Sequence, residues 1–181
     1  MSVSASISYP QILGKAIGFR NKFDIKANID VVEEVDEVRY GVCYIDGPYN
    51  FIGIRFNNRG DFVAIKKNEC LGIAIAGVET KIKGVFTPVA NIRTPRIGVH
   101  RLWIEIVYRV DEEEKKVLEQ EIEFIALPSW QAMITGLFLG ASGYYFSGGG
   151  RTGSVIGVGS MVMGSILTDM VIASSERYKV E

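Results

Sequence analysis

The sequence predicts a mainly β protein, an antiparallel immunoglobulin-like β-sandwich of seven or eight strands, followed by a C-terminal hydrophobic helical hairpin. Two observations support this fold class. Short runs of β-forming residues, many with alternating apolar and polar side chains, fill residues 20–127, and turn-forming residues separate them. The residues that follow, 129–175, carry only two charged side chains, which is typical of helices that face other protein or lipid.

A change of composition at Pro128 divides the chain. We predict an N-terminal segment at 1–19, a β-sandwich domain at 20–127 and a glycine-rich apolar helical hairpin at 128–181. The composition of the hairpin predicts that it is transmembrane. The charged residues lie almost entirely before the boundary. We therefore expect the sandwich to complete its own core and to fold without the tail.

Alternation with a period of two is clearest at the two ends of the sandwich. Near its start, apolar residues alternate with polar ones at Phe23, Ile25, Ala27, Ile29 and Val31. Near its end, a hairpin of two long strands points these side chains inward: Leu102, Ile104, Ile106, Ile122 and Phe124. Antibody domains place a tryptophan between two cysteines, and this chain does not, so the prediction is of an architecture and not of a family.

The C-terminal part predicts two helices joined by a glycine-rich turn. Ser129 offers an N-cap hydroxyl, and residues 130–146 contain no charge. After the turn, residues 153–173 are apolar apart from small residues and Asp169. At 1.5 Å per residue these helices would span roughly 25 and 32 Å, against about 30 Å for the hydrocarbon core of a bilayer.

Small residues at a spacing of four predict close packing of the two helices. The residues assigned to helix packing and oligomerisation are Gly136, Gly140, Gly153, Gly157 and Gly164. In water, each glycine inside a helix costs roughly 0.5–1 kcal/mol relative to alanine. In lipid, every other backbone conformation would leave polar groups without hydrogen bonds, so the helix is strongly favoured despite its glycines. A membrane hairpin is therefore the favoured interpretation, and a hairpin buried between the subunits of a soluble oligomer is the alternative.

Asp169 is the one acidic residue within the second apolar helix. A carboxylate in a membrane is costly, which makes Asp169 a candidate functional intramembrane group, in proton transfer or in a contact between subunits. The simpler alternative is structural. Asp169 lies close to the helix end, where it could reach the interface or accept a hydrogen bond from Ser165.

Cys43 and Cys70 are too few for a disulfide framework. Unpaired cysteine is among the most buried residue types, so two buried free thiols are the favoured interpretation. A single bridge across the sandwich is the alternative.

Composition excludes several classes of function. Lys plus Arg number 20 and Asp plus Glu number 21, so the net charge is −1 and gives no basic footprint for nucleic acid. The two thiols and the single histidine, His100, have no metal-ligand spacing, so we predict no metal and no cofactor. No residue set has catalytic spacing, and no catalytic residue is assigned.

These patterns favour a non-enzymatic structural or interaction protein, anchored in a membrane or an assembly by its hairpin. A virion or cell-envelope component, or an accessory subunit of a membrane complex, would fit. The expected partners are the lipid bilayer and either copies of the same chain, in a homo-oligomer, or other membrane subunits. The alternatives are a soluble oligomeric assembly protein, and a ligand carrier or enzyme with a site built from loops.

A hairpin places the sandwich and both termini on the same side of a membrane. Arg177 and Lys179 follow the second helix, whereas the turn between the helices carries only Arg151. Cytoplasmic segments carry an excess of basic residues. The sequence therefore weakly favours the cytoplasm for the sandwich.

Overall fold

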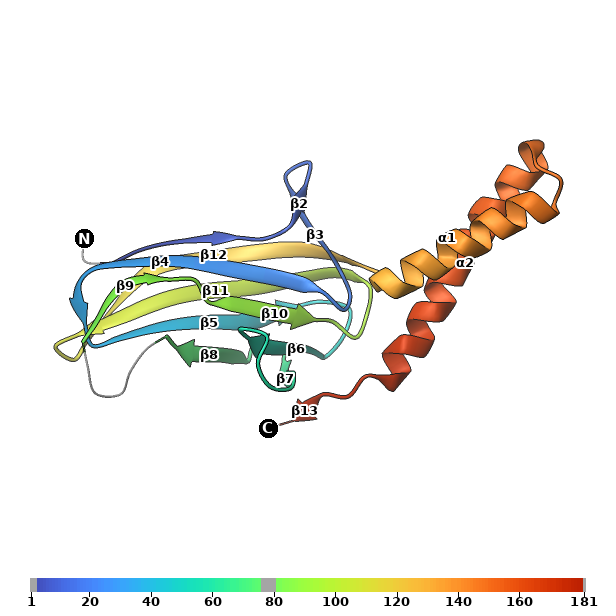
Figure 1. Cartoon of the computed structure of the whole chain (residues 1–181). Helices are drawn as coiled ribbons and strands as arrows, with labels where there is room; N and C mark the ends of the chain where they lie inside the picture. The colour runs from blue at the N-terminus through green and yellow to red at the C-terminus, as the bar shows by residue number, and fades with distance from the viewer. Residues whose placement is uncertain (1–2, 76–80, 181) are drawn as a thin grey trace.

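The computed structural model describes residues 3–75 and 81–180. It is an antiparallel immunoglobulin-like β-sandwich followed by a C-terminal helical hairpin, as the sequence predicts. The two sheets lie face to face, and the helices project from one end of the sandwich (Figure 1). Nearly all neighbouring strands in the described part run antiparallel; the exceptions are the pairs β3–β12 and β7–β13.

The first sheet has seven strands. Six of them lie in the spatial order β1 (Val3–Ser8), β4 (Phe23–Val35), β10 (Val89–Arg93), β6 (Phe51–Phe56), β7 (Val63–Lys66) and β13 (Lys179–Val180). The seventh, β9 (Ile82–Phe86), also pairs with β4.

The second sheet has six strands. In spatial order they are β2 (Gln11–Ile12), β3 (Lys15–Phe19), β12 (Glu113–Leu127), β11 (Gly98–Val110), β5 (Glu37–Asp46) and β8 (Cys70–Ala74). The described chain thus has more strands than the seven or eight expected, because short strands such as β2 and β13 form by pairing with distant segments and show no local periodicity of their own.

The core lies between the sheets and consists of the side chains that the alternation places inward. Every predicted inward residue of β4 is buried: Phe23, Ile25, Ala27, Ile29 and Val31. The inward residues of the β11–β12 hairpin are buried as well: Leu102, Ile104, Ile106, Ile122 and Phe124. Phe124 stacks on Phe23 with ring centroids 4.2 Å apart, so the first and last long strands meet in the centre of the sandwich.

Segments outside the predicted boundaries of the sandwich also join its sheets. Strand β1 pairs along β4, and Val3 is part of the core. Strand β3 pairs with the end of β12, and β13 returns after the helices to pair with β7. The structure therefore extends the sandwich into the segment assigned to 1–19 and into the end of the chain, while the independent folding of 20–127 stays a prediction.

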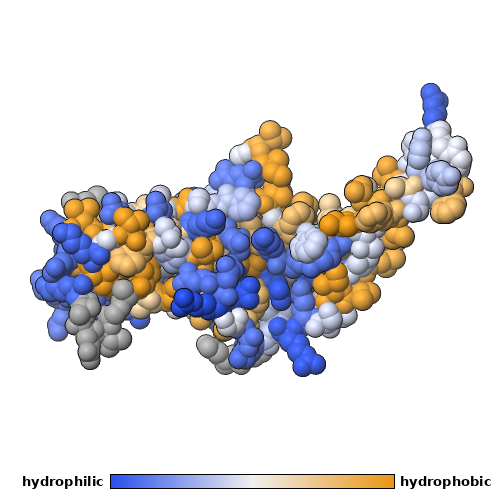
Figure 2. All heavy atoms as spheres, viewed as in Figure 1, coloured by the Kyte–Doolittle hydropathy of each residue, from blue (hydrophilic) through white to orange (hydrophobic). Residues whose placement is uncertain are grey.

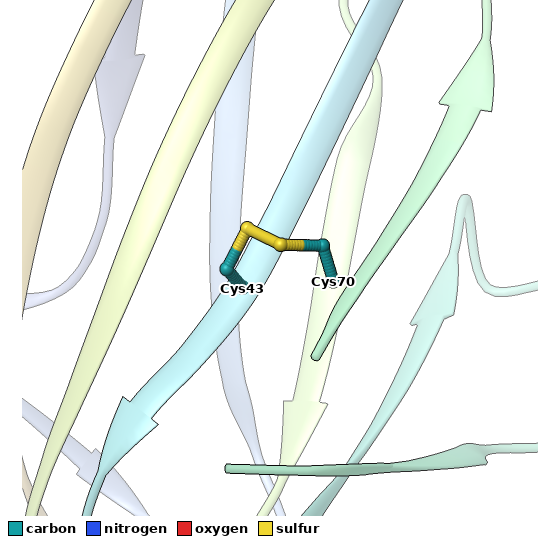
Figure 3. Close-up of a disulfide and its surroundings, with 2 residues drawn as sticks. All are labelled: Cys43 and Cys70. Carbon is teal, nitrogen blue, oxygen red and sulfur yellow. A yellow bond between two sulfur atoms is a disulfide. The ribbon is translucent and has the colours of Figure 1, made fainter. Parts of the chain in front are cut away.

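Cys43 of β5 and Cys70 of β8 form a disulfide (Figure 3). The two residues lie directly opposite each other in the antiparallel pair of strands, with their Cα atoms 3.9 Å apart. The favoured interpretation of two free thiols is therefore wrong. Sequence spacing carries no information on this register, because β5 and β8 are separated by two other strands along the chain.

The helical hairpin consists of α1 (Trp130–Phe146) and α2 (Gly150–Ser175). Ser129 is the N-cap of α1, and its Oγ accepts a hydrogen bond from the backbone amide of Ala132. Gly148 and Gly149 make the turn with positive φ angles, which glycine adopts without steric cost. The two helices lie side by side and project away from the sandwich over most of their length (Figure 1).

Candidate functional site

The two helices of the hairpin meet along a seam of glycines. Gly136, Gly140, Gly153, Gly157 and Gly164 are the buried glycines of the seam. A Cβ atom added at Gly140 would lie 2.8 Å from the carbonyl oxygen of Gly157, and one at Gly157 would lie 2.9 Å from that of Gly140. The two backbones are therefore in direct contact, which only residues without side chains allow.

This seam lies within one chain. Both members of each close approach, such as Gly140 with Gly157 and Gly164 with Leu139, belong to the same hairpin. In the structure these glycines lie at the contact between α1 and α2. Their assignment to contacts between subunits stays a prediction, and a second copy would meet the outward side chains of the hairpin first.

The outward faces of the hairpin carry many large apolar side chains. On α1 the exposed large apolar residues are Trp130, Ile134, Leu137, Phe138, Leu139, Tyr144, Tyr145 and Phe146. On α2 they are Val155, Ile156, Val158, Val162, Met163, Leu167, Met170 and Val171. Figure 2 shows hydrophobic colour over much of the hairpin's visible face, whereas the sandwich shows a mixed and largely hydrophilic face.

Length and composition match a membrane span. Among the described residues, Gly150–Ser175 is the one helix long and apolar enough to cross a membrane, and only 22% of its most apolar stretch is buried in the protein. Helix α1 has 17 residues and so reaches about 25 Å. Most of that stretch is therefore exposed on the surface of the single chain.

A buried ion-pair network fixes the base of the hairpin to the sandwich. Arg20, which directly follows β3, is fully buried. Its Nε donates to both carboxylate oxygens of Asp169, each at 3.0 Å, and its Nη1 donates to Oε2 of Glu176 at 2.7 Å. Nη1 also donates to the backbone oxygen of Thr94 at 3.2 Å. One guanidinium thus joins β3, the loop after β10, and the end of α2.

Electrostatics favour the charged form of Arg20 at this position. Burial lowers the pKa of the guanidinium, but its hydrogen bonds and charge interactions with Glu176 and Asp169 outweigh that effect and leave the pKa above its ordinary value. A buried guanidinium is stable only when its donors are satisfied. The planar guanidinium of arginine has donors on several nitrogens and can hydrogen-bond to two carboxylates at once, whereas lysine has a single ammonium group.

Asp169 lies at the base of the hairpin, level with the start of α1. Its Oδ1 accepts a hydrogen bond from the backbone amide of Ser129 at 2.7 Å, and it pairs with Arg20. Ser165, the expected donor, instead donates to the backbone oxygen of Met161. The nineteen residues of α2 before Asp169, from Gly150 to Thr168, would span about 28 Å, close to the thickness of a hydrocarbon core. A role for Asp169 in proton transfer or subunit contact stays a prediction.

Further contacts hold the base of the hairpin. The backbone amide of Arg20 donates to Leu127 at 2.7 Å, and the amide group of Asn21 donates to the side-chain oxygen of Gln131 at 2.7 Å. Beyond α2, the ring of Tyr178 packs over Gly53, where a Cβ atom would lie 2.6 Å from Cδ1 of the tyrosine. The start of α1 and the segment after α2 thus both contact the sandwich, and both do so at the same end of it (Figure 1).

The sequence interpretation missed Arg20 as the partner of Asp169, and Glu176 as the second carboxylate that Arg20 binds. Arg20 is 149 residues from Asp169, and no periodic pattern connects positions so far apart. One signal was present: a lone acidic residue in an apolar helix needs a positive partner when it is buried. The candidate partners were all the basic residues of the sandwich, and sequence could not choose among them.

His100 belongs to the core. Its ring is fully buried and stacks on Phe124 with centroids 5.2 Å apart, and its Nε2 lies 3.0 Å from the backbone oxygen of Arg96. Burial lowers the pKa of His100, so the ring is neutral near pH 7. Over the described ranges, no group of three or more His, Cys, Asp or Glu side chains is placed to hold a metal ion.

No protein-family model matches the chain, and no curated protein matches its sequence. Solved structures resemble it at low identity. A family 123 glycoside hydrolase from Clostridium perfringens is 16% identical with a TM-score of 0.44, over 80% of this chain and 32% of that one. A non-cellulosomal cohesin from Archaeoglobus fulgidus is 16% identical with a TM-score of 0.37, over 71% of this chain and 95% of that one.

A third similar structure is WR4, an MSP family member from C. elegans, which is 11% identical with a TM-score of 0.30, over 61% of this chain and 90% of that one. The chain spans about a third of the length of the glycoside hydrolase. Likeness of this degree concerns the β-sandwich fold alone, and no function is carried over from it.

Proposed function

We propose that the protein is a non-enzymatic interaction protein whose β-sandwich is held at a membrane surface by the α1–α2 hairpin. The observation that carries the proposal is the hairpin's outward surface. Large apolar side chains such as Phe138 and Val155, 70% and 74% exposed, make up much of it, and the sandwich leaves them uncovered. An apolar surface of this extent on a soluble monomer would drive association.

The glycine seam supports lipid as the covering environment. The backbones of α1 and α2 approach each other directly at the glycines, and the larger side chains against the seam, Leu139, Met161 and Tyr144, are not fully buried. In water such a seam would contribute little hydrophobic stabilisation, whereas in lipid close van der Waals packing is the main attraction between helices. The turn Gly148–Gly149 and the nearby Arg151 would then lie on the far side of the bilayer.

The disulfide supports the oxidising side of the membrane for the sandwich. Cys43 and Cys70 are bonded in the second sheet, and disulfides persist mainly in secreted, periplasmic or surface locations. The basic residues Arg177 and Lys179 weakly favour the opposite orientation. We give the disulfide more weight, because the charge difference across the hairpin is small. The outer face of a cell envelope, or of a membrane-bearing virion, would meet this condition.

The base of the hairpin suggests what the anchor does beyond attachment. Arg20 joins α2 to both sheets through buried contacts, so the sandwich cannot turn freely on the hairpin. The exposed edges and loops of the sandwich would therefore be presented at a fixed angle to the membrane, available to other subunits or to copies of the same chain.

Membrane fractionation tests the proposal. The full chain should remain in the membrane pellet after carbonate extraction and should need detergent for release. The matched variant replaces residues 131–167 by a short Gly–Ser linker and keeps Ser129, Asp169 and the C-terminal strand, because the contact between Ser129 and Asp169 shows that the two ends are adjacent. This variant should be soluble.

A full chain that is soluble and monodisperse without detergent would contradict membrane anchoring. If it were soluble as a defined oligomer, the hairpin would instead be buried between subunits. Orientation is tested separately, by protease protection of the sandwich in intact cells or sealed vesicles.

A further inference from the structure

A second apolar element projects from the sandwich. The loop that joins β2 to β3 places Ile12 and Leu13 at its tip, 59% and 100% exposed. Leu13 also has a positive φ of 51°, a backbone conformation that favours glycine and asparagine over branched apolar residues. Neither packing within the chain nor backbone geometry accounts for leucine at this position, because the side chain contacts nothing that would bury it.

The root of this loop adjoins the base of the hairpin. Strand β3 runs parallel to the last residues of β12, with Phe19 opposite Leu127, and α1 begins three residues later. Arg20 follows β3 directly and forms the ion pair with Asp169. The loop and the hairpin are therefore fixed to the same end of the second sheet.

The loop and the tip of the hairpin also lie toward the same side of the sandwich, although the loop rises directly from it and the hairpin runs obliquely from its end. In Figure 1 both rise above the sandwich toward the top of the view, and in Figure 2 both carry hydrophobic colour. From Phe19 to Leu13 the chain covers six residues, about 20 Å when extended. Since a bilayer crossed by the hairpin begins near its base at Trp130, a loop of this reach on the same side can enter the adjacent leaflet.

We propose that the β2–β3 loop is a second membrane contact, which inserts Ile12 and Leu13 into the leaflet next to the sandwich. The inference rests on the membrane anchoring proposed above. The occupant is lipid and not a protein, because the exposed tip consists of two residues, Ile12 and Leu13, at the end of a projecting loop and is not lined as a groove. Lys15 is exposed beside the tip and would meet the phosphate groups of the lipids.

Depth-dependent fluorescence quenching tests this contact in the full chain. Leu13→Cys provides one free thiol, since the described cysteines are joined in a disulfide, and it is labelled with an environment-sensitive dye and reconstituted into phosphatidylcholine vesicles. Two controls are labelled in the same way: Phe138→Cys, outward on α1, and Glu114→Cys, on β12 more than ten residues from the hairpin.

Lipids with a quencher near the headgroup should reduce emission from the Leu13 label several-fold more than from the Glu114 label. The Phe138 label should respond most to a quencher deep in the acyl chains. Quenching at Leu13 no stronger than at Glu114, with Phe138 quenched, would overturn the loop contact and leave the anchor intact. No quenching at Phe138 would remove the anchor itself. A blue-shifted Leu13 label that lipid quenchers do not reach would indicate cover by another protein copy and would also overturn the proposal.

Discussion

The sandwich and the hairpin place their large apolar side chains in opposite ways. In the sandwich, the large apolar side chains point inward and the charged ones outward, and Phe124 is fully buried at the centre. In the hairpin, glycines occupy the interior and Phe138, Leu137 and their neighbours point outward. The same residue types thus form a core in one part and an outer surface in the other, a difference that the proposed membrane anchor would explain.

The junction between these two parts is polar and buried. Arg20 is fully buried, and Asp169 and Glu176 satisfy its charge where the sandwich ends and the apolar helices begin. A buried ion pair adds little net stability compared with a well-packed apolar contact, but it specifies geometry, because it is satisfied in only one arrangement. We therefore expect the junction to fix the angle of the hairpin.

The largest effect is expected in the core of the sandwich. Phe124→Ala removes the ring that stacks on Phe23 and on His100, and should lower the free energy of unfolding by about 3–5 kcal/mol. Chemical denaturation of the full chain in mild detergent measures this. Trp103→Ala, on the half-buried outer face of the same strand pair, should cost clearly less. Equal losses would show that a partner covers the outer face.

The next effect is expected at the junction. Asp169→Ala leaves the buried Arg20 with one carboxylate fewer and removes the acceptor of the Ser129 amide. The loss should be about 3 kcal/mol, with faster proteolysis at the end of α2. Asp61→Asn breaks the exposed pair with Lys179 and is the matched control, with little expected change. An Asp169 variant as stable as the control would mean that the network does not fix the hairpin.

A smaller effect is expected in the glycine seam. Gly157→Ala places a methyl group against the backbone oxygen of Gly140. The methyl group should push the two helices apart and weaken the free energy of their packing by about 1–3 kcal/mol. Gly159→Ala, two residues later in the same helix, meets no atom within 4 Å, so it should be neutral. The measurement is the distance between spin labels on the two helices in bilayers. If both variants behave alike, the seam is not close-packed.

The smallest effect concerns pH. Burial lowers the pKa of His100 below its ordinary value of 6.5, so the unfolded chain binds a proton at higher pH than the folded chain. The stabilisation is present above pH 6.5 and is lost as the pH falls through the lower folded-state pKa. Unfolding measured between pH 7.5 and 5 should show this loss, and His100→Gln should flatten it. An unchanged slope in the variant would assign the pH dependence to other groups.

Local pattern alone determined much of this structure. Alternation fixed the inward faces of β4, β11 and β12, because side chains in a strand point to opposite faces in turn. Between Ser129 and Asp169 the only charged residue is Arg151, and Gly148–Gly150 separate two apolar runs; this pattern determined the two helices and their turn. Glycine spacing determined the seam between the helices, since residues four apart share one face of a helix.

Tertiary structure decided the contacts that join distant segments. The Cys43–Cys70 bond depends on the register of β5 against β8, and the short strands β1 and β13 exist only through pairing with β4 and β7. The pairing of Arg20 with Asp169 depends on where the hairpin meets the sandwich. Periodicity describes which face a residue occupies, but not which distant residue faces it; that choice is made when the whole chain closes around its core.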